Sequence, residues 1–162
     1  IHPQTLSDRR MYRELRRPLK SKQHDAREAF MDRLADRNDY DRVEVQNEPI
    51  LNWDEVRELS DHPLVTIGVH THSHVVLPQQ PWSVAYRELK SSKHSLERQI
   101  GKPVEYLSYP YGSDSLIVRQ MARWLGIRYG FTTQSKRTHR INTWNRVSIP
   151  RIDISGFVDG DG

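Results

Sequence analysis

Hydrophobic and polar residues alternate along this chain with two different periods. From residue 82 to 101, apolar side chains return every three or four positions, which is typical of a helix that buries one face. Residues 51–62 and 113–126 show the same period, so we predict three helices in this part of the chain. The side chains expected to face the core are Ala85, Leu89, Leu96 and Ile100 in the longest helix, and Leu116 or Ile117, Met121 and Leu125 in the last one.

Four short apolar runs lie between and after these helices and are rich in β-branched and aromatic residues. Runs of this kind, bounded by proline, glycine or polar residues, predict β-strands. They are residues 64–69, 104–109, 128–133 and 147–154. Helices and strands therefore alternate from residue 50 onward, which favours an α/β fold with a parallel sheet covered by helices.

The N-terminal part of the chain has a different character. Residues 7–37 are mostly charged and predict two helices separated at Pro18, because proline interrupts a helical pattern. The polar residues 38–49 then read as a loop. We assign residues 1–49 to a charged helical segment that covers or is inserted into the fold, and residues 50–162 to the main domain.

Composition narrows the possible functions. The hydrophobic content of 35% is low for a globular protein but well above that of a disordered chain. The net charge of +4 comes from 25 basic and 21 acidic residues that are interleaved, so we expect no nucleic-acid partner. Cysteine is absent, so a transition metal would need histidine or carboxylate ligands. We find no apolar run near the ~20 residues of a membrane span and no signal peptide.

The segment "HTHSH" at residues 70–74 contains three of the 8 histidines and directly follows a predicted strand. His70 and His74 are four positions apart, so a helical turn would bring both imidazoles to one side, where they could share a metal. Thr71 could hydrogen-bond within the loop and hold its shape. Catalytic zinc takes three protein ligands and a water, so two histidines make an incomplete site. From these residues alone, a set of loop histidines without a metal is an equally good interpretation.

The segment "YPYG" at residues 109–112 ends the next predicted strand. Pro110 fixes a backbone angle, and Gly112 permits an unusual one. A rigid turn of this kind can direct a backbone N–H, here that of Tyr111, at a developing oxyanion. A plain strand-to-helix turn capped by Ser113 or Asp114 is the alternative.

The order of these motifs resembles the polysaccharide deacetylases of the NodB-homology type, carbohydrate esterase family four. The resemblance covers residues 50–154, and residues 7–37 are similar to a helical insertion that some bacterial members carry before the histidine motif. The segments that carry the resemblance are "LNWDEVREL", "VTIGVHTHSHVVL", "IGKPV", "YLSYPYGS", "LGIRYGFTT" and "VSIPRIDI".

This resemblance implies a distorted (β/α) barrel, incomplete in this chain and accompanied by the N-terminal helical insertion. It implies a hydrolase that removes N-acetyl groups from N-acetylglucosamine units of a cell-wall or exopolysaccharide and releases acetate. It also implies a divalent metal, with zinc preferred and cobalt or nickel as alternatives. A carboxylate would act as general base. Family members usually act outside the cytoplasm, which is the location we expect.

The resemblance also assigns roles by motif position. The metal ligands would be His70 and His74. Tyr111 would supply the oxyanion N–H, and Pro110 would make that turn rigid. Thr71 and Tyr109 would belong to the substrate-binding site, and Arg151, in "PRID", would replace the family's arginine that orients the base.

The chain departs from the family pattern at the first motif, an Asp-Asp pair that supplies the base and the third metal ligand. No two aspartates are adjacent in the 162 residues, and the first residue is Ile1, so we expect the natural start to lie upstream. Asp8 and Asp153 are the nearest substitutes, and His139 is a candidate for the missing general acid. The chain is then a piece of a longer enzyme, the product of a split gene, or a non-catalytic relative.

Two further functions remain open at this point. A glycan-binding relative without turnover would use exposed aromatic rings for sugar stacking, for which we consider Trp53, Trp82, Tyr109, Tyr111 and Trp144. A regulatory or nucleic-acid protein would use the basic segment from residue 9 to 22, with salt-sensitive affinity. Because an incomplete barrel has unpaired edges, we also expect a missing upstream segment or a second copy of the chain as a partner.

Overall fold

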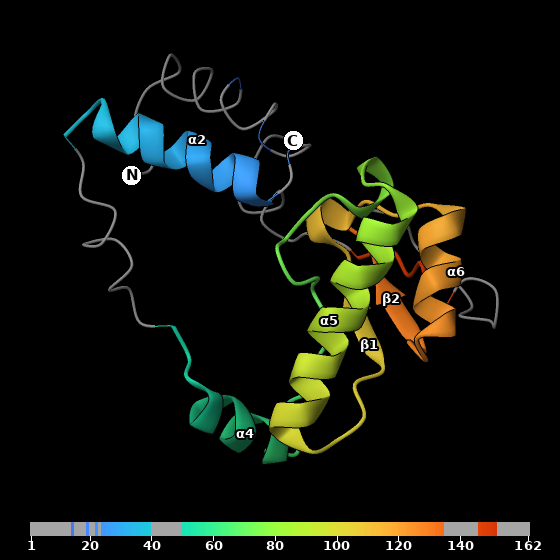
Figure 1. The fold of residues 1–162 in the computed structure, drawn as a ribbon. Coiled ribbons are helices and arrows are strands. Elements are labelled where there is room, and N and C mark those ends of the chain that lie inside the picture. Colours follow the sequence, from blue (N-terminus) through green and yellow to red (C-terminus); the bar gives the residue numbers. More distant parts are fainter. Residues whose placement is uncertain are drawn as a thin grey trace, which may run out of the picture. The chain divides into compact units, whose positions relative to one another are not determined.

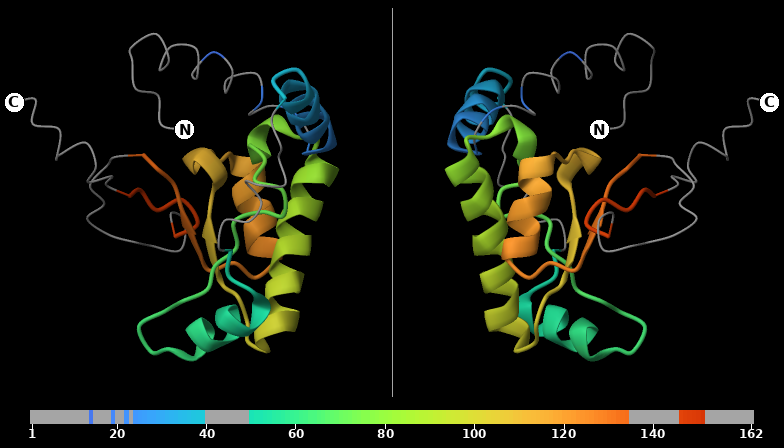
Figure 2. Two further views of the ribbon diagram at one scale, coloured as in Figure 1. Left: turned by 90° about the vertical axis from the view of Figure 1, so that its left-hand side faces the viewer. Right: turned by 90° about the vertical axis from the view of Figure 1, so that its right-hand side faces the viewer.

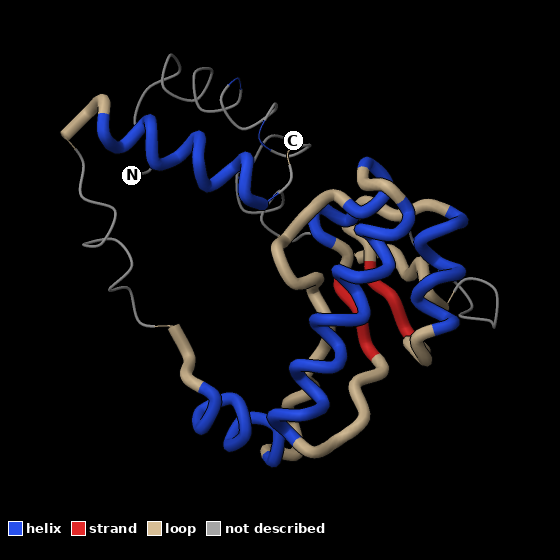
Figure 3. Tube along the Cα trace, viewed as in Figure 1, coloured by secondary structure: helices blue, strands red, loops and turns tan. Residues whose placement is uncertain are grey.

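The computed structural model describes residues 24–39, 50–134 and 146–151, together with the single residues 14, 19 and 22. The chain forms two compact units, Ile1–Asn52 and Trp53–Gly162, and each is considered by itself. Helices and loops make up most of the described residues, and the strands are short (Figure 3). None of the described helices combines the length and the apolar character that crossing a bilayer requires.

In the first unit, the described structure is helix α2, His24–Asp36. An acidic residue in its first turn and a basic one in its last, Asp25 and Arg33, both suit the helix dipole. Asn38 then donates a side-chain hydrogen bond of 2.7 Å to the carbonyl of Leu34 and satisfies one of the last free carbonyls. Most of the predicted helix before Pro18 lies outside the described residues. The role of residues 1–49 as a cover or insertion stays a prediction.

The second unit alternates helices with strands, as the sequence pattern predicts (Figure 1). Its elements are α4 (Trp53–Asp61), η1 (Leu77–Gln79), α5 (Trp82–Ile100), β1 (Tyr106–Ser108), η2 (Pro110–Gly112), α6 (Leu116–Trp124) and β2 (Tyr129–Phe131). Gly101 ends α5 in a left-handed conformation, with φ of 67°. This is the helix stop that glycine favours.

The strands are parallel. β1 pairs with β2 in the register Tyr106↔Tyr129, and parallel bridges extend this arrangement on both sides, from Val69 to Leu107 and from Phe131 to Ile149. The α/β class is therefore confirmed. The predicted strand 64–69 is wrong as a full strand, because it forms a single bridge, at Val69. Of the second predicted strand, 147–154, the structure describes residues 147–151, which form a single bridge at Ile149, and the rest lies outside the described residues. In the second, Pro150 also has no N–H to donate.

Helices α5 and α6 cover the same face of the strands (Figure 2). All four residues predicted on the inner face of α5 face the core, since Ala85 and Leu89 are buried in it and Leu96 and Ile100 are partly buried and pack against it. It is completed by Val69, Val75, Leu77, Val104, Leu107, Tyr109, Val118, Met121, Ala122 and Ile127, with Tyr86 and Leu125 at its margin.

In α6 the prediction that Leu116 or Ile117 faces the core is wrong, because their exposed fractions are 79% and 66%. The buried stripe instead begins one position later, at Val118, and continues through Met121, Ala122 and Leu125. This spacing of three, four and seven positions is that of a single helical face. Ser115 fixes the start of the helix by accepting a hydrogen bond from the N–H of Val118.

The turn η2, which follows β1, has an unusual backbone conformation. Within η2, Tyr111 has a φ of 57° and Gly112 a φ of 66°, so two successive residues are left-handed. A Cβ atom on Gly112 would lie 2.7 Å from the Cβ of Thr133 and closer still to its backbone nitrogen. Only glycine therefore fits where this turn packs against the chain after β2.

We predict that Leu89→Ala lowers the free energy of unfolding by about 2–5 kcal/mol, because it opens a cavity in the core. Leu116→Ala removes the same atoms from an exposed position of α6 and is expected to stay within about 0.5 kcal/mol of the parent. Urea unfolding of the three proteins measures the difference. Equal losses from both substitutions would contradict the described core.

We also predict that Gly112→Ala destabilises the protein more than Gly101→Ala. Both glycines have nearly the same positive φ, so both substitutions carry the left-handed cost of about 1–2 kcal/mol. A Cβ atom on Gly101 meets nothing within 4 Å, whereas one on Gly112 collides with Thr133. Overpacking adds about 1–3 kcal/mol. Equal urea midpoints for the two variants would mean that the turn does not pack as described.

Candidate metal and catalytic site

The predicted site residues meet at one edge of the parallel strands. His70 follows the bridge at Val69, Pro110 and Tyr111 follow β1, and Arg151 follows the bridge at Ile149. Because the strands are parallel, their carboxyl ends lie at the same edge, which is where ligand sites form in α/β folds. The fold thus gathers residues that are more than 80 positions apart in the sequence.

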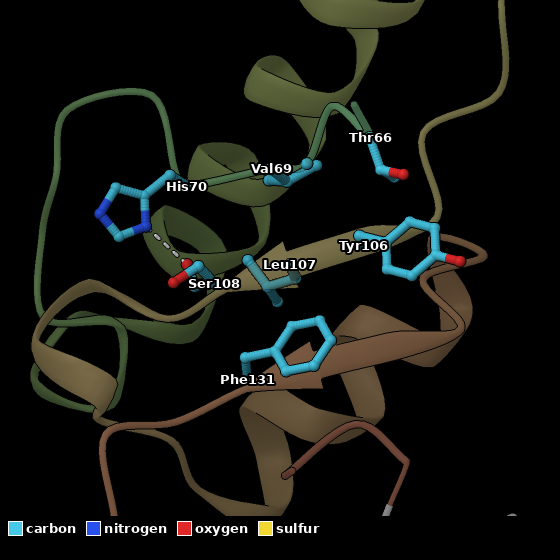
Figure 4. A pocket seen from close by; sticks show the side chains of 8 residues that line it. Thr66, Val69, His70, Tyr106, Leu107, Ser108 and Phe131 are labelled. Atoms are coloured by element: carbon cyan, nitrogen blue, oxygen red, sulfur yellow. Dashed lines mark hydrogen bonds between the residues drawn. The ribbon is translucent and has the colours of Figure 1, made fainter. Parts of the chain in front are cut away.

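His70 is held by the neighbouring strand. Its Nδ1 lies 2.7 Å from the carbonyl oxygen of Ser108, the last residue of β1 (Figure 4). A carbonyl can only accept, so Nδ1 carries the proton in this contact. The lone pair of the neutral ring is then on Nε2, and this is the arrangement in which metal-binding histidines are usually fixed. The sequence assigned Ser108 no role, and only the strand register reveals this contact.

His74 faces His70 across the loop. The two ring centres are 4.8 Å apart, with planes inclined by 68°. Two imidazoles that bind one tetrahedral zinc at about 2.0–2.1 Å have ring centres about 5 Å apart. Both histidines are solvent-exposed, so an ion can reach them. The pair therefore has the spacing and the accessibility that a shared divalent metal requires.

A third ligand is not present among the residues that the structure describes, where no group of three His, Asp or Glu side chains could hold a metal ion. The substitutes considered from the sequence, Asp8 and Asp153, and the candidate acid His139 lie outside the described residues. The described part of the site thus contains two of the predicted ligands, His70 and His74, and their binding of a metal stays a prediction.

The histidine loop has an unusual backbone. Thr71 and His74 have φ values of 64° and 52°, a region that non-glycine residues rarely adopt and that is common at functional sites. The hydroxyl of Thr71 is buried and has no hydrogen-bond partner among the described residues, so the local bond expected from its sequence position does not form. Its role in substrate binding stays a prediction.

Glu88 of α5 binds the backbone of this loop through hydrogen bonds. One carboxylate oxygen, Oε2, accepts hydrogen bonds from the N–H groups of His72 and Ser73, at 3.0 and 2.8 Å. Sequence reasoning missed this residue. A signal was present, because Glu88 is three positions after buried Ala85 and four before buried Ser92, so an acid occupies the margin of the inner helix face.

The YPYG turn closes the other side of the site. The ring of Tyr111 lies 4.9 Å from that of His74, nearly perpendicular to it, and the carbonyl of Tyr111 accepts a hydrogen bond of 3.2 Å from Thr133 Oγ1. Pro110 is buried within the turn. Tyr111 is therefore placed beside His74, and the use of its N–H for an oxyanion stays a prediction.

Tyr109 does not belong to the exposed site. Its side chain is 1% exposed, and its hydroxyl donates a hydrogen bond of 2.7 Å to the carbonyl of Val147. Burial, together with the nearby Asp114, raises the pKa of this phenol far above its usual value. The prediction that Tyr109 is an exposed sugar-binding residue is therefore wrong: its polar tip is used within the core. Trp53 and Trp82 are exposed as expected, whereas Trp144 lies outside the described residues.

Arg151 reaches the end of β2. Its Nε donates a hydrogen bond of 2.9 Å to the carbonyl of Thr132, next to the residue that contacts Tyr111. The residue itself is exposed. Arg151 is thus at the correct edge of the strands, and its proposed effect on a general base stays untested.

A pocket of about 450 Å³ lies against the strands beside His70 (Figure 4). Its walls are mostly apolar and come from β1, from Phe131 of β2 and from the residues just before and at His70. They are Thr66, Gly68, Val69, His70, Tyr106, Leu107, Ser108 and Phe131. His70 is one of the residues that line it, so the pocket and the His70–His74 pair share one residue.

Comparison with solved structures finds deacetylases of similar fold, and three of them are described here. They are the Streptococcus pyogenes deacetylase PplD in complex with acetate (27% identity, TM-score 0.51), the BpsB deacetylase domain of Bordetella bronchiseptica (21%, 0.53) and a putative polysaccharide deacetylase of Bacillus anthracis (24%, 0.56). They align with 56%, 63% and 66% of this chain, which spans 39%, 48% and 33% of theirs. A search of curated proteins finds no match.

A sequence profile of a protein family also matches this chain, and it covers a larger part of it. The profile of the family described as polysaccharide deacetylase matches residues 6–130. This match begins before the motifs noted in the sequence, so it includes the charged N-terminal segment, and it ends before residues 147–154. Since the match covers more than half of the sequence, this chain belongs to the polysaccharide deacetylase family.

Proposed function

We propose that this protein takes part in the metal-dependent hydrolytic removal of acetyl groups from N-acetylglucosamine units of a cell-wall or exopolysaccharide. The observation that carries the proposal is the His70–His74 pair, with ring centres 4.8 Å apart and His70 fixed through Nδ1 by Ser108. Family membership supports deacetylation. The acetate bound to the Streptococcus pyogenes deacetylase agrees with such a product.

In this proposal, His70 and His74 hold a divalent metal, with zinc preferred and cobalt or nickel as alternatives. When bound, such an ion supplies Lewis acidity for the acetyl carbonyl. The N–H of Tyr111 would stabilise the negative charge that develops on that carbonyl, and buried Pro110 would keep its direction constant. Thr71 would contact substrate, and Arg151 would orient the base from the end of β2.

The general base and an oxygen ligand would come from a segment outside the described residues, or from another chain. No Asp-Asp pair occurs in the sequence, and the chain spans less than half of each of the three structures described above. We propose that the parallel strands belong to a distorted (β/α) barrel that such a segment completes. We also propose a location outside the cytoplasm, where cell-wall and exopolysaccharides are found.

A glycan-binding relative without turnover is the second candidate. It is favoured by the exposed rings of Trp53 and Trp82, and by the presence of two rather than three metal ligands among the described residues. Glycan binding that survives a chelator, with no acetate released, would support this candidate against the enzyme.

The first test is the metal content of the purified protein after dialysis against trace zinc. We expect about one zinc per chain, lost in His70→Ala and in His74→Ala, because removal of either nitrogen leaves too few ligands. His94→Ala is the matched control, since this histidine is exposed on α5 and should leave the zinc content unchanged. Retention of zinc by both site variants would contradict the assigned ligands.

The second test is acetate release from N-acetylglucosamine oligosaccharides by the same four proteins. Activity in the parent that is abolished by His70→Ala and kept by His94→Ala supports the enzyme. Zinc binding without acetate release would support the glycan-binding relative, provided that the oligosaccharide still binds.

A further inference from the structure

We propose that Glu88 is a positioning residue that holds the histidine loop in the shape in which His70 and His74 face each other. The proposal rests on the proposed function in so far as it concerns a metal. Its structural part, that Glu88 fixes the loop backbone, stands on the described contacts alone.

The contact is unusually specific. A single oxygen of Glu88 accepts from two successive backbone N–H groups, those of His72 and Ser73. Two adjacent N–H groups that converge on one point form an anion-binding hollow, and a carboxylate is the side chain that fits it. Because the acceptor carries a charge, these bonds are stronger than those between neutral groups.

The loop needs such support because its backbone is strained on both sides of this contact. Thr71, just before the two bonded residues, has a φ of 64°, and His74, just after them, has a φ of 52°. Left-handed conformations persist in non-glycine residues only where surrounding contacts enforce them. The hydroxyl of Thr71 does not supply such a contact, since it has no hydrogen-bond partner among the described residues. Glu88 supplies a side-chain contact of this kind to the middle of the loop.

Glu88 is held in place by the helix that carries it. Glu88 lies in the second turn of α5, a helix that buries Ala85 and Leu89 in the core. The loop is thus fixed at two points, at His70 by the carbonyl of Ser108 and at its centre by Glu88. Together these contacts set the distance between the two imidazoles.

Glu88 is not itself the missing third ligand. Its oxygen is directed at the backbone of the loop, and no described cluster of three His, Asp or Glu side chains could hold a metal. The residue therefore acts on the metal through the loop. Partners of this kind typically change metal affinity by about 10–100-fold when they are removed.

The test compares the parent with Glu88→Ala and Glu88→Gln by ¹⁵N NMR. In Glu88→Ala the amide protons of His72 and Ser73 should move upfield and exchange faster with solvent, because they lose a charged acceptor. Glu88→Gln keeps an acceptor oxygen without the charge, so it should give intermediate shifts. Unchanged amide shifts and exchange in Glu88→Ala would overturn the proposal, whether or not the protein binds zinc.

The same proteins are then titrated with zinc. Glu88→Ala should weaken zinc binding by about 10–100-fold, and Glu88→Gln should restore part of the affinity. Glu97→Ala is the matched control, because Glu97 is another carboxylate of α5 that accepts a backbone N–H, that of Val104, and makes no described contact with the histidine loop. Zinc affinity that falls equally in Glu97→Ala would mean that general destabilisation is the cause.

The amide NMR data and the zinc affinities together distinguish a failure of the metal-dependent function from a failure of the role of Glu88. If the parent binds no zinc, the metal-dependent function fails, while the amide shifts still decide the role of Glu88 in the loop. If zinc binds but Glu88→Ala leaves its affinity and the amide shifts unchanged, the role of Glu88 fails and the metal site stands. Circular dichroism on each variant establishes that it is folded.

Discussion

The site depends on the parallel pairing between the residues that precede the histidines and β1. The N–H of Val69 donates to the carbonyl of Tyr106, and the N–H of Ser108 donates to the carbonyl of Val69. This pair of bonds fixes the register in which His70 reaches the carbonyl of Ser108. A shift by one residue would turn every side chain of the segment to the other face, so the register decides which side of the strands carries the imidazole.

Two strained turns are built on that register. The histidine loop and the YPYG turn both contain left-handed residues, and they meet where the rings of His74 and Tyr111 lie 4.9 Å apart. Each turn is held by contacts from elsewhere in the unit, the first from Glu88 and the second from Thr133. The local backbone is therefore determined by tertiary contacts, which explains how unfavourable conformations persist beside each other.

The core and the site share the same elements. The inner face of α5 is buried against the strands, while its margin supplies Glu88 to the loop. β1 likewise buries Leu107 and offers the carbonyl of Ser108. Since each of these elements has a packing role as well as a site role, disruption of the core would also displace the histidines.

The sequence alone determined the α/β class, the family, the length of α5 and its inner face, because these follow from residue spacing and from motifs that are local in the chain. It also placed His70 and His74 together, since four positions within one loop limit their separation. The sequence-based prediction was wrong where tertiary contacts determine which residues are buried or paired. In α6 the buried stripe begins at Val118 and not at Leu116 or Ile117, and the predicted strand 64–69 forms a single bridge.

The tertiary structure alone decided that Tyr109 is buried and that Ser108, Glu88 and Thr133 support the site. Tyr109 and Tyr111 are two positions apart in one motif, and no local pattern distinguishes the ring that enters the core from the ring that faces His74. The contacts of Glu88 and Ser108 join residues 15 and 38 positions from their partners. Local periodicity carries no information on such pairs, because only the packing of the helix and the register of the strands bring them together.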